Sequence, residues 1–139
     1  MFLLDTNVVS ELRKSRTPHI HPKVDAWLAR VPATDMYLSA IVIEELEVGI
    51  LRAQRQDPPF GTLLRNWFST HVVPTFRERV LPVDMAVALA SAPFQFPITH
   101  PFHDSVIAAT ALVHGLTVAT RNMADFELLG VPVVNPWNG

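Results

Sequence analysis

Four acidic residues, spread along most of the chain, have the types and positions expected of a metal-binding site. Asp5, Asp104 and Asp125 each lie just after an apolar strand or at the start of a predicted helix. Glu45 lies on a stripe of another predicted helix that is otherwise largely apolar. Carboxylates do not gather without a counter-charge, and oxygen ligands of this kind suit Mg²⁺ or Mn²⁺. The pattern therefore predicts a divalent-cation site whose natural chemistry is the hydrolysis of a phosphodiester bond.

An ordinary structural role is also open to three of these acids. Aspartate is favoured at helix N-caps, so Asp5, Asp104 and Asp125 could each do no more than begin a helix. Only two lysines, Lys14 and Lys23, are present to neutralise an acidic cluster. The metal-site prediction depends on convergence, because open α/β sheets bind ligands at the carboxyl ends of their strands. Four polar residues near the predicted strand ends could orient carboxylates or water there: Thr6, Asn7, Thr120 and Asn122.

Strands alternate with helices along the chain, which predicts a three-layer α/β domain around a mostly parallel sheet. The stretch 2–7 is read as the first strand, an apolar run that ends at Asp5. Further short apolar runs predict strands at residues 37–39, 80–83, 116–120 and 131–134. Apolar residues at helical spacing predict helices at residues 8–12, 23–30, 40–56, 60–75, 85–91, 104–114 and 123–130.

Several single residues mark where these elements begin and end. Ser39 and Asp84 are predicted N-caps, and Gly115 is a predicted C-cap. The segment 92–103 contains three prolines, which excludes a regular helix and predicts an ordered loop.

Composition narrows the class of protein. The 139 residues suit one domain spanning 1–139, with 49% hydrophobic and only 17% charged residues. The low charge and the apolar helices within 40–75 predict at least a dimer that binds a small partner by a helix-in-groove contact. The absence of cysteine excludes disulfides and thiolate metal sites and fits a cytoplasmic protein. No apolar run is long enough for a membrane span, and a net charge of −2 argues against a broad basic surface for nucleic acid.

Five segments, in the same order and over the whole chain, resemble the PIN-domain ribonuclease toxins of the VapC and FitB type. These segments lie at residues 3–7, 38–49, 103–111, 120–126 and 131–137. The resemblance implies a three-layer α/β/α PIN-like fold and an Mg²⁺- or Mn²⁺-dependent endoribonuclease. It also implies that the toxin is a homodimer held inactive by a cognate VapB-like antitoxin, which itself binds DNA.

The resemblance assigns roles to particular residues. It makes Asp5, Glu45, Asp104 and Asp125 the metal-binding acids, supported by Thr120 and Asn122. Three arginines are then candidates for RNA phosphate contacts, with simple surface charge as the alternative for each: Arg13, Arg52 and Arg121. Asn122 stands where some family members carry a further acid.

Two histidines near the third acid could act chemically. His100 and His103 form a candidate metal-binding or general-base pair, although loop histidines beside prolines commonly have no such role. His103 stands where a small residue is more usual in the family, and the segment 91–103 before the third acid is shorter and richer in proline than the family suggests.

Other functions share parts of this pattern. A phosphatase with Asp5 as its nucleophile would want a second acid where Asn7 stands, and a downstream lysine. A phospho-accepting receiver domain would want the same lysine. A catalytically silent partner-binding module is also compatible with the sequence. If the four acids do converge, their mutual repulsion must raise at least one carboxylate pKa.

Overall fold

A five-stranded, parallel sheet lies at the centre of the computed structural model, which describes residues 1–138. The strands lie in the order β3-β2-β1-β4-β5. Their bounds are β1 (Phe2–Leu4), β2 (Met36–Ser39), β3 (Val80–Leu81), β4 (Thr117–Ala119) and β5 (Val133–Val134). Strand β1 is central, and its Leu3 and Leu4 are fully buried, as a continuous apolar run predicts.

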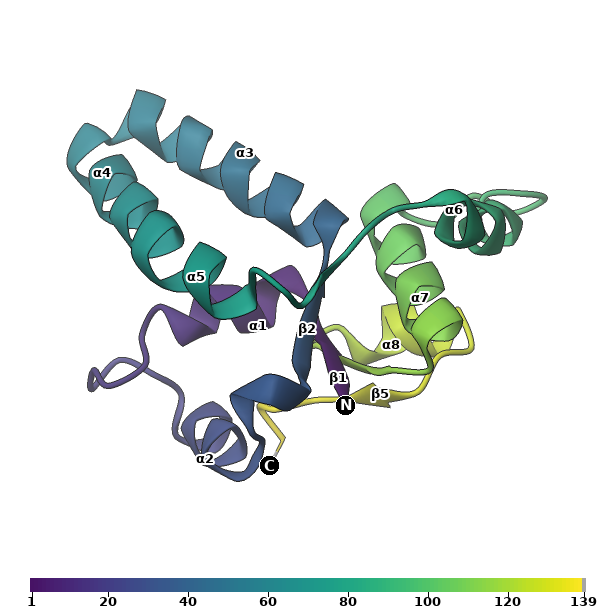
Figure 1. The fold of residues 1–139 in the computed structure, drawn as a ribbon, viewed down its shortest axis with the longest axis horizontal. Helices are drawn as coiled ribbons and strands as arrows, with labels where there is room; N and C mark the ends of the chain where they lie inside the picture. Colours follow the sequence, from purple (N-terminus) through teal and green to yellow (C-terminus); the bar gives the residue numbers. More distant parts are fainter. Residues whose placement is uncertain (139) are drawn as a thin grey trace.

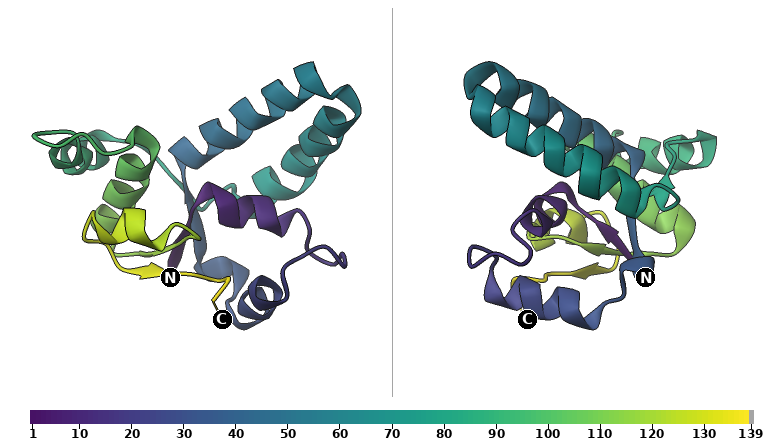
Figure 2. Two further views of the ribbon diagram at one scale, coloured as in Figure 1. Left: turned by 180° about the vertical axis from the view of Figure 1, so that it is seen from behind. Right: turned by 60° about the vertical axis from the view of Figure 1, so that its left-hand side comes forward.

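Helices cover both faces of the sheet, so the predicted three-layer α/β architecture is confirmed (Figure 1). Their bounds are α1 (Thr6–Leu12), α2 (Pro22–Arg30), α3 (Ala40–Gln56), α4 (Pro58–Trp67), α5 (Val73–Phe76), α6 (Met85–Ser91), α7 (Phe102–His114) and α8 (Met123–Glu127). Helices α1 and α2 lie on one side of the sheet, and α7 and α8 on the other (Figures 1 and 2). The α3–α4 hairpin projects beyond the sheet. Within residues 1–138, no helix is long and apolar enough to cross a membrane.

The order of the strands creates a switch point in the middle of the sheet. The chain moves outward from β1 to β2 and β3, then returns to the other side of β1 to form β4 and β5. Leu3 pairs with Tyr37 of β2 on one side and with Val118 of β4 on the other. The connections after β1 and β4 therefore leave in opposite directions, which opens a crevice at the carboxyl ends of these two strands.

The predicted helix caps are confirmed. The Ser39 hydroxyl accepts a hydrogen bond from the Ile41 N–H at 3.3 Å, and Asp84 accepts one from the Val87 N–H at 3.0 Å. Gly115 has a φ of 67°, the left-handed conformation that a glycine C-cap adopts at the end of α7.

Several element boundaries differ from the sequence predictions. The first strand, for example, ends at Leu4, and α1 begins at Thr6, within the predicted strand 2–7. The helix predicted at 60–75 begins earlier, at Pro58, because proline is well tolerated in a first helical turn. It continues through a π-helical segment, η2 (Phe68–Val72), into α5. The last strand is shorter than the predicted 131–134, although β5 does lie at the edge of the sheet.

The predicted loop at 92–103 is partly helical. Its first residues form a 3₁₀ turn, η3 (Ala92–Phe94), which accommodates Pro93 in its first turn. Helix α7 begins at Phe102, with Pro101 at its N-cap. The N-cap alternative for Asp104 is therefore wrong, because Asp104 lies inside the first turn. It is also wrong for Asp125, because Asn122 is the N-cap residue of α8.

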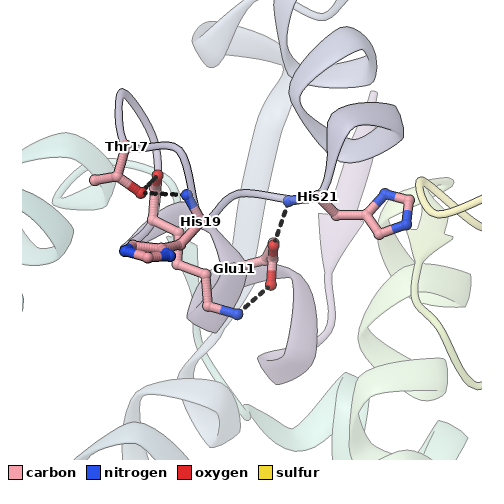
Figure 3. Close-up of polar contacts among 5 residues, drawn as sticks. Glu11, Thr17, His19 and His21 are labelled. Atoms are coloured by element: carbon pink, nitrogen blue, oxygen red, sulfur yellow. Dashed lines mark hydrogen bonds and ion pairs between the residues drawn. The ribbon is translucent and has the colours of Figure 1, made fainter.

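A buried carboxylate fastens the loop between α1 and α2 (Figure 3). Glu11 accepts a hydrogen bond from the His21 N–H at 2.8 Å and one from the Lys14 ammonium at 3.1 Å. Burial alone would raise the pKa of Glu11, but these two hydrogen bonds and the positive charges of Lys14 and Arg121 outweigh it, and the pKa is lowered. Glu11 is therefore a charged structural group with its partners supplied by the chain.

Candidate active site

Asp5 lies at the switch point of the sheet and is the most constrained of the four acids. Its backbone N–H donates to the Ala119 carbonyl at 2.9 Å, which extends the pairing of β1 with β4. One carboxylate oxygen accepts from the Thr6 N–H at 2.8 Å, so Asp5 does cap α1. The other accepts from the Thr120 hydroxyl at 2.7 Å and from the Asn7 side-chain amide at 3.3 Å. Asp5 thus joins the ends of the two strands that border the crevice.

The pKa of Asp5 is raised in spite of these hydrogen bonds. Burial is the largest cause, since only 5% of the residue is exposed. The hydrogen bonds from Thr120, Thr6 and Asn7 act against it, and the negative charge of Asp125 adds to it. An ionised Asp5 is therefore short of positive charge in its surroundings.

Glu45 reaches the same crevice from α3. Its carboxylate accepts a hydrogen bond from the Thr6 hydroxyl at 3.0 Å, which ties α3 to the start of α1. Burial raises the pKa of Glu45, the Thr6 hydrogen bond and His103 act against it, and the charges of Asp5 and Glu44 add to it. The net direction is again upward.

Asp104 shows that the four acids share one electrostatic environment. Its pKa is raised to about 6, first by burial and then by the charges of Asp5, Asp125 and Glu45, with a small opposing effect of His103. The structure therefore brings together all four acids that the sequence singled out. They come from the end of β1 and from α3, α7 and α8, which are far apart in the chain.

The chemistry of this donor set fits a hard divalent cation. All four groups are carboxylates, and the pKa values of three of them are raised, first by burial and then by neighbouring negative charges, both of which a cation would offset. Within residues 1–138, no three acidic or histidine side chains are already arranged to hold an ion. The acids are gathered but not drawn together to the spacing of metal ligands.

Three of the four predicted supporting residues, Thr6, Asn7 and Thr120, donate side-chain hydrogen bonds to the acids. Asn7 donates to Asp5 through its amide nitrogen and accepts from the Arg121 N–H at 3.3 Å through its amide oxygen. Thr120 is fully buried, and its hydroxyl accepts from the Asn122 N–H at 2.9 Å while it donates to Asp5. Together with Thr6, these residues fix the directions of the Asp5 and Glu45 carboxylates.

The three predicted arginines are placed differently. Arg52 lines a hollow of about 230 Å³ together with Glu45 and His103. Arg121 directly follows Thr120, and its guanidinium lies 4.1 Å from the centre of the Trp137 ring. Arg13 stacks on Phe60 instead, in a hollow that none of the four acids lines.

The two histidines have different neighbours. His103 Nε2 lies 3.9 Å from a carboxylate oxygen of Glu44, at the start of α7. His100 is held through its backbone by Phe94 and by the Gln95 side chain. Sequence reasoning also missed two contacts of the region, those of buried Glu11 and of Trp137 with Arg121, because each joins segments that only the fold brings together.

Comparison with known proteins identifies the family. The family model described as PIN domain matches residues 2–129. The chain belongs to the PIN-domain family. This PIN domain is 38% identical to "Toxin FitB" of Neisseria gonorrhoeae, over 99% of both chains. It is 36% identical to "VapC ribonuclease Y4jK" of Sinorhizobium fredii, over 99% of this chain and 98% of that protein.

A solved structure extends the likeness to three dimensions. The structure of FitAB bound to an IR36 DNA fragment contains a chain that is 35% identical to this PIN domain. The two superpose with a TM-score of 0.83 over 99% of this chain and 96% of that one. The resemblance to the VapC and FitB type that the sequence indicated is confirmed.

Proposed function

We propose that this PIN domain is a metal-dependent endoribonuclease and the toxin of a type II toxin–antitoxin pair. The observation that carries the proposal is the convergence of four carboxylates at the switch point of the sheet, with the pKa of Asp104 raised to about 6 by burial and by the charges of the other three. The relatives named as a VapC ribonuclease and a FitB toxin support the reaction class.

The four acids, Asp5, Glu45, Asp104 and Asp125, would hold Mg²⁺ or Mn²⁺. A bound ion of this kind polarises a phosphoryl oxygen and lowers the pKa of the attacking water. Thr120 and Asn7 keep the Asp5 carboxylate fixed by their hydrogen bonds, and Thr6 does the same for Glu45. This fixed arrangement lowers the cost of reorganisation when substrate and cation arrive.

Arg52 and Arg121 would contact the RNA backbone. Arg52 lines the hollow that contains Glu45, and Arg121 follows Thr120 in sequence. We leave Arg13 out of the substrate site, because its guanidinium stacks on Phe60 away from the acids.

The proposed partners follow from the family. We infer a homodimer that binds a VapB-like antitoxin, in line with the FitAB complex of a relative that is 35% identical. Contact with DNA would be made through the antitoxin, since this chain has a net charge of −2. An RNA substrate and the absence of cysteine fit a cytoplasmic location.

An RNA cleavage assay tests the proposal. Purified protein incubated with total RNA should produce discrete fragments in Mg²⁺ or Mn²⁺ and none in EDTA. The Asp104→Asn variant should be folded and inactive. Cleavage that survives EDTA, or that folded Asp104→Asn retains, would contradict the assignment, and a wild-type protein that binds RNA without cutting it would favour a silent binding module.

A further inference from the structure

Gly49 lies in the middle of α3, where a glycine weakens the helix relative to alanine. The residue is exposed, and a Cβ added there would meet no atom within 4 Å. Gly61 of α4 is different, because an added Cβ would lie 2.4 Å from the Cα of Gln54. Close packing of α3 on α4 thus explains Gly61, whereas packing within the chain gives no reason for a glycine at position 49.

The missing side chain opens a hollow beside the four acids. This hollow is the cavity of about 230 Å³ that Arg52 and Glu45 line, and its other lining residues are Glu44, Val48, Gly49 and His103. Glu45 belongs to the acid cluster, and His103 directly precedes Asp104. The hollow over Gly49 is therefore continuous with the proposed site of cleavage.

Charge is distributed along this hollow in a definite order. Glu45, Gly49 and Arg52 follow one another at spacings of four and three residues, so they share one face of α3. Seven residues of helix span about 10 Å, with carboxylates at one end and a guanidinium at the other. A phosphate is attracted to the Arg52 end and repelled from the Glu44 and Glu45 end.

We propose that the hollow over Gly49 binds the ribonucleotide next to the scissile phosphate, with its sugar and base against Gly49 and its outer phosphate at Arg52. The proposal rests on the ribonuclease function proposed above. Glu44 can accept hydrogen bonds from the ribose 2′-hydroxyl or from base N–H groups, and Val48 offers an apolar contact for the base.

A protein helix is the other occupant that a surface glycine could admit. Val48 and Leu51 beside Gly49 are 44% and 55% exposed, which would suit a second copy of this chain. The lining of the hollow favours RNA, because two carboxylates, an arginine and a histidine surround the glycine. Carboxylates such as Glu44 and Glu45 are depleted at the centres of protein interfaces.

Substitutions that fill the hollow test the proposal. Gly49→Ala and Gly49→Leu should raise the Tm, since both residues favour helix and the space is empty. They should also raise KM for a short single-stranded RNA, with Gly49→Leu raising it about tenfold, and leave kcat unchanged. Ala26→Leu, at an exposed position of α2, is the matched control and should leave KM unchanged.

A charge substitution tests the other end of the hollow. Arg52→Gln should raise KM and lower the slope of log KM against log salt by about one, as expected for the loss of one phosphate contact. Arg30→Gln on α2 is the control for charge alone. The fluorescence anisotropy of a labelled RNA, measured on Asp104→Asn variants, should show the same losses without cleavage.

The outcomes separate the possible failures. A wild-type KM and RNA affinity in Gly49→Leu would overturn the proposal while leaving the ribonuclease function standing. A change in molar mass by light scattering with an unchanged KM would assign the hollow to a protein interface and also overturn it. A wild-type protein that neither binds nor cleaves RNA in Mg²⁺ would refute the proposed function itself.

Discussion

Helix α1 carries a buried carboxylate at each end, and the two have opposite electrostatic surroundings. Asp5, at the N-cap, is 5% exposed, and Glu11, in the last turn, is 6% exposed. The pKa of Asp5 is raised, mainly by burial and with a contribution from Asp125. The pKa of Glu11 is lowered, because the His21 N–H and the Lys14 ammonium outweigh the effect of its burial.

This difference shows that burial alone does not distinguish a structural acid from a functional one. Glu11 is neutralised by groups that the chain itself supplies, so nothing from outside is needed. Asp5 is surrounded by hydrogen-bond donors that fix its direction and by further acids that add negative charge. In the proposed site, a cation from solution would complete the charge balance of Asp5.

The largest expected contrast is in activity. Asp5→Asn should lower RNA cleavage at least about a hundredfold, because it removes a proposed metal ligand. Glu11→Gln should cleave RNA at the wild-type rate per folded molecule. Single-turnover cleavage rates, corrected for the folded fraction by circular dichroism, compare the two. Equal losses in both variants would mean that α1 affects activity only through the fold.

Stability should change in the direction opposite to activity at the acid cluster. Burial and three acids raise the pKa of Asp104 from its usual value near 3.8 to about 6. Below pH 3.8 the carboxyl is neutral in both states, and between 3.8 and 6 the unfolded chain loses a proton that the folded site retains. The metal-free protein therefore loses stability as pH rises through this window.

Removing the Asp104 charge should recover that stability. In EDTA at pH 7, Asp104→Asn should be more stable than wild type by about 2 kcal/mol, after discounting the shift for partial solvent screening. Millimolar Mn²⁺ should shrink or reverse the difference, because a ligand of the native state stabilises it. Thermal melts of Asp104→Asn and wild type across pH, in EDTA and in Mn²⁺, measure this difference in stability. A variant no more stable than wild type in EDTA would mean that neither burial nor the other acids penalise the Asp104 charge.

The hydrogen bond that the Thr120 hydroxyl donates to Asp5 provides a finer test of the proposed metal site. Thr120→Val should weaken Mn²⁺ binding about tenfold, because Asp5 loses the hydrogen bond that most favours its ionised form. Thr110→Val is the control, since Thr110 is also fully buried but bonds Val106 and Ser39 instead. Calorimetric titration of both variants with Mn²⁺ should show weaker binding only in Thr120→Val.

The smallest expected effect concerns Glu11, the acid whose charge is neutralised within the chain. Glu11→Gln should lower the free energy of unfolding by about 1 kcal/mol at pH 7, because it removes a charge-assisted hydrogen bond with Lys14. The pKa of Glu11 is lowered, so its contribution is present above the usual value near 4.5 and is lost as pH falls through the lower folded value. Urea melts of Glu11→Gln and wild type should therefore converge once the pH has fallen below this lowered folded pKa. A difference in the free energy of unfolding that persists at this low pH would mean that Glu11 stabilises the fold by packing.

The acid cluster was predictable because its members lie at the ends or starts of recognisable elements. Asp5 follows a continuous apolar strand, and the crevice rule places such ends together. Glu45 stands out because a carboxylate interrupts an apolar stripe. These signals are local. The alternation of strands with helices predicts the parallel sheet whose strand ends bring the acids together.

Contacts between loops and distant segments were not predictable. The partner of Glu11 is the N–H of His21, ten residues away across an irregular loop that has no periodic pattern. Arg13 was one candidate for a phosphate contact, with simple surface charge as the alternative. Its stacking on Phe60 of α4 was not predictable, because it depends on the α3–α4 hairpin returning over α1. Proline content alone did not show that α7 begins directly after Pro101.

The topology of the sheet also fixes when this site can exist during synthesis. The hydrogen bond from Thr120 to Asp5 joins residues 115 positions apart, and Asp125 comes later still. Strand β1 is synthesised first, but its edge opposite β2 can pair only after β4, the next-to-last strand, has been synthesised. A nascent chain that has emerged only as far as α7 thus holds three of the acids without the strand that aligns the first of them. The proposed cleavage site therefore stays unformed on the ribosome until the final strands emerge.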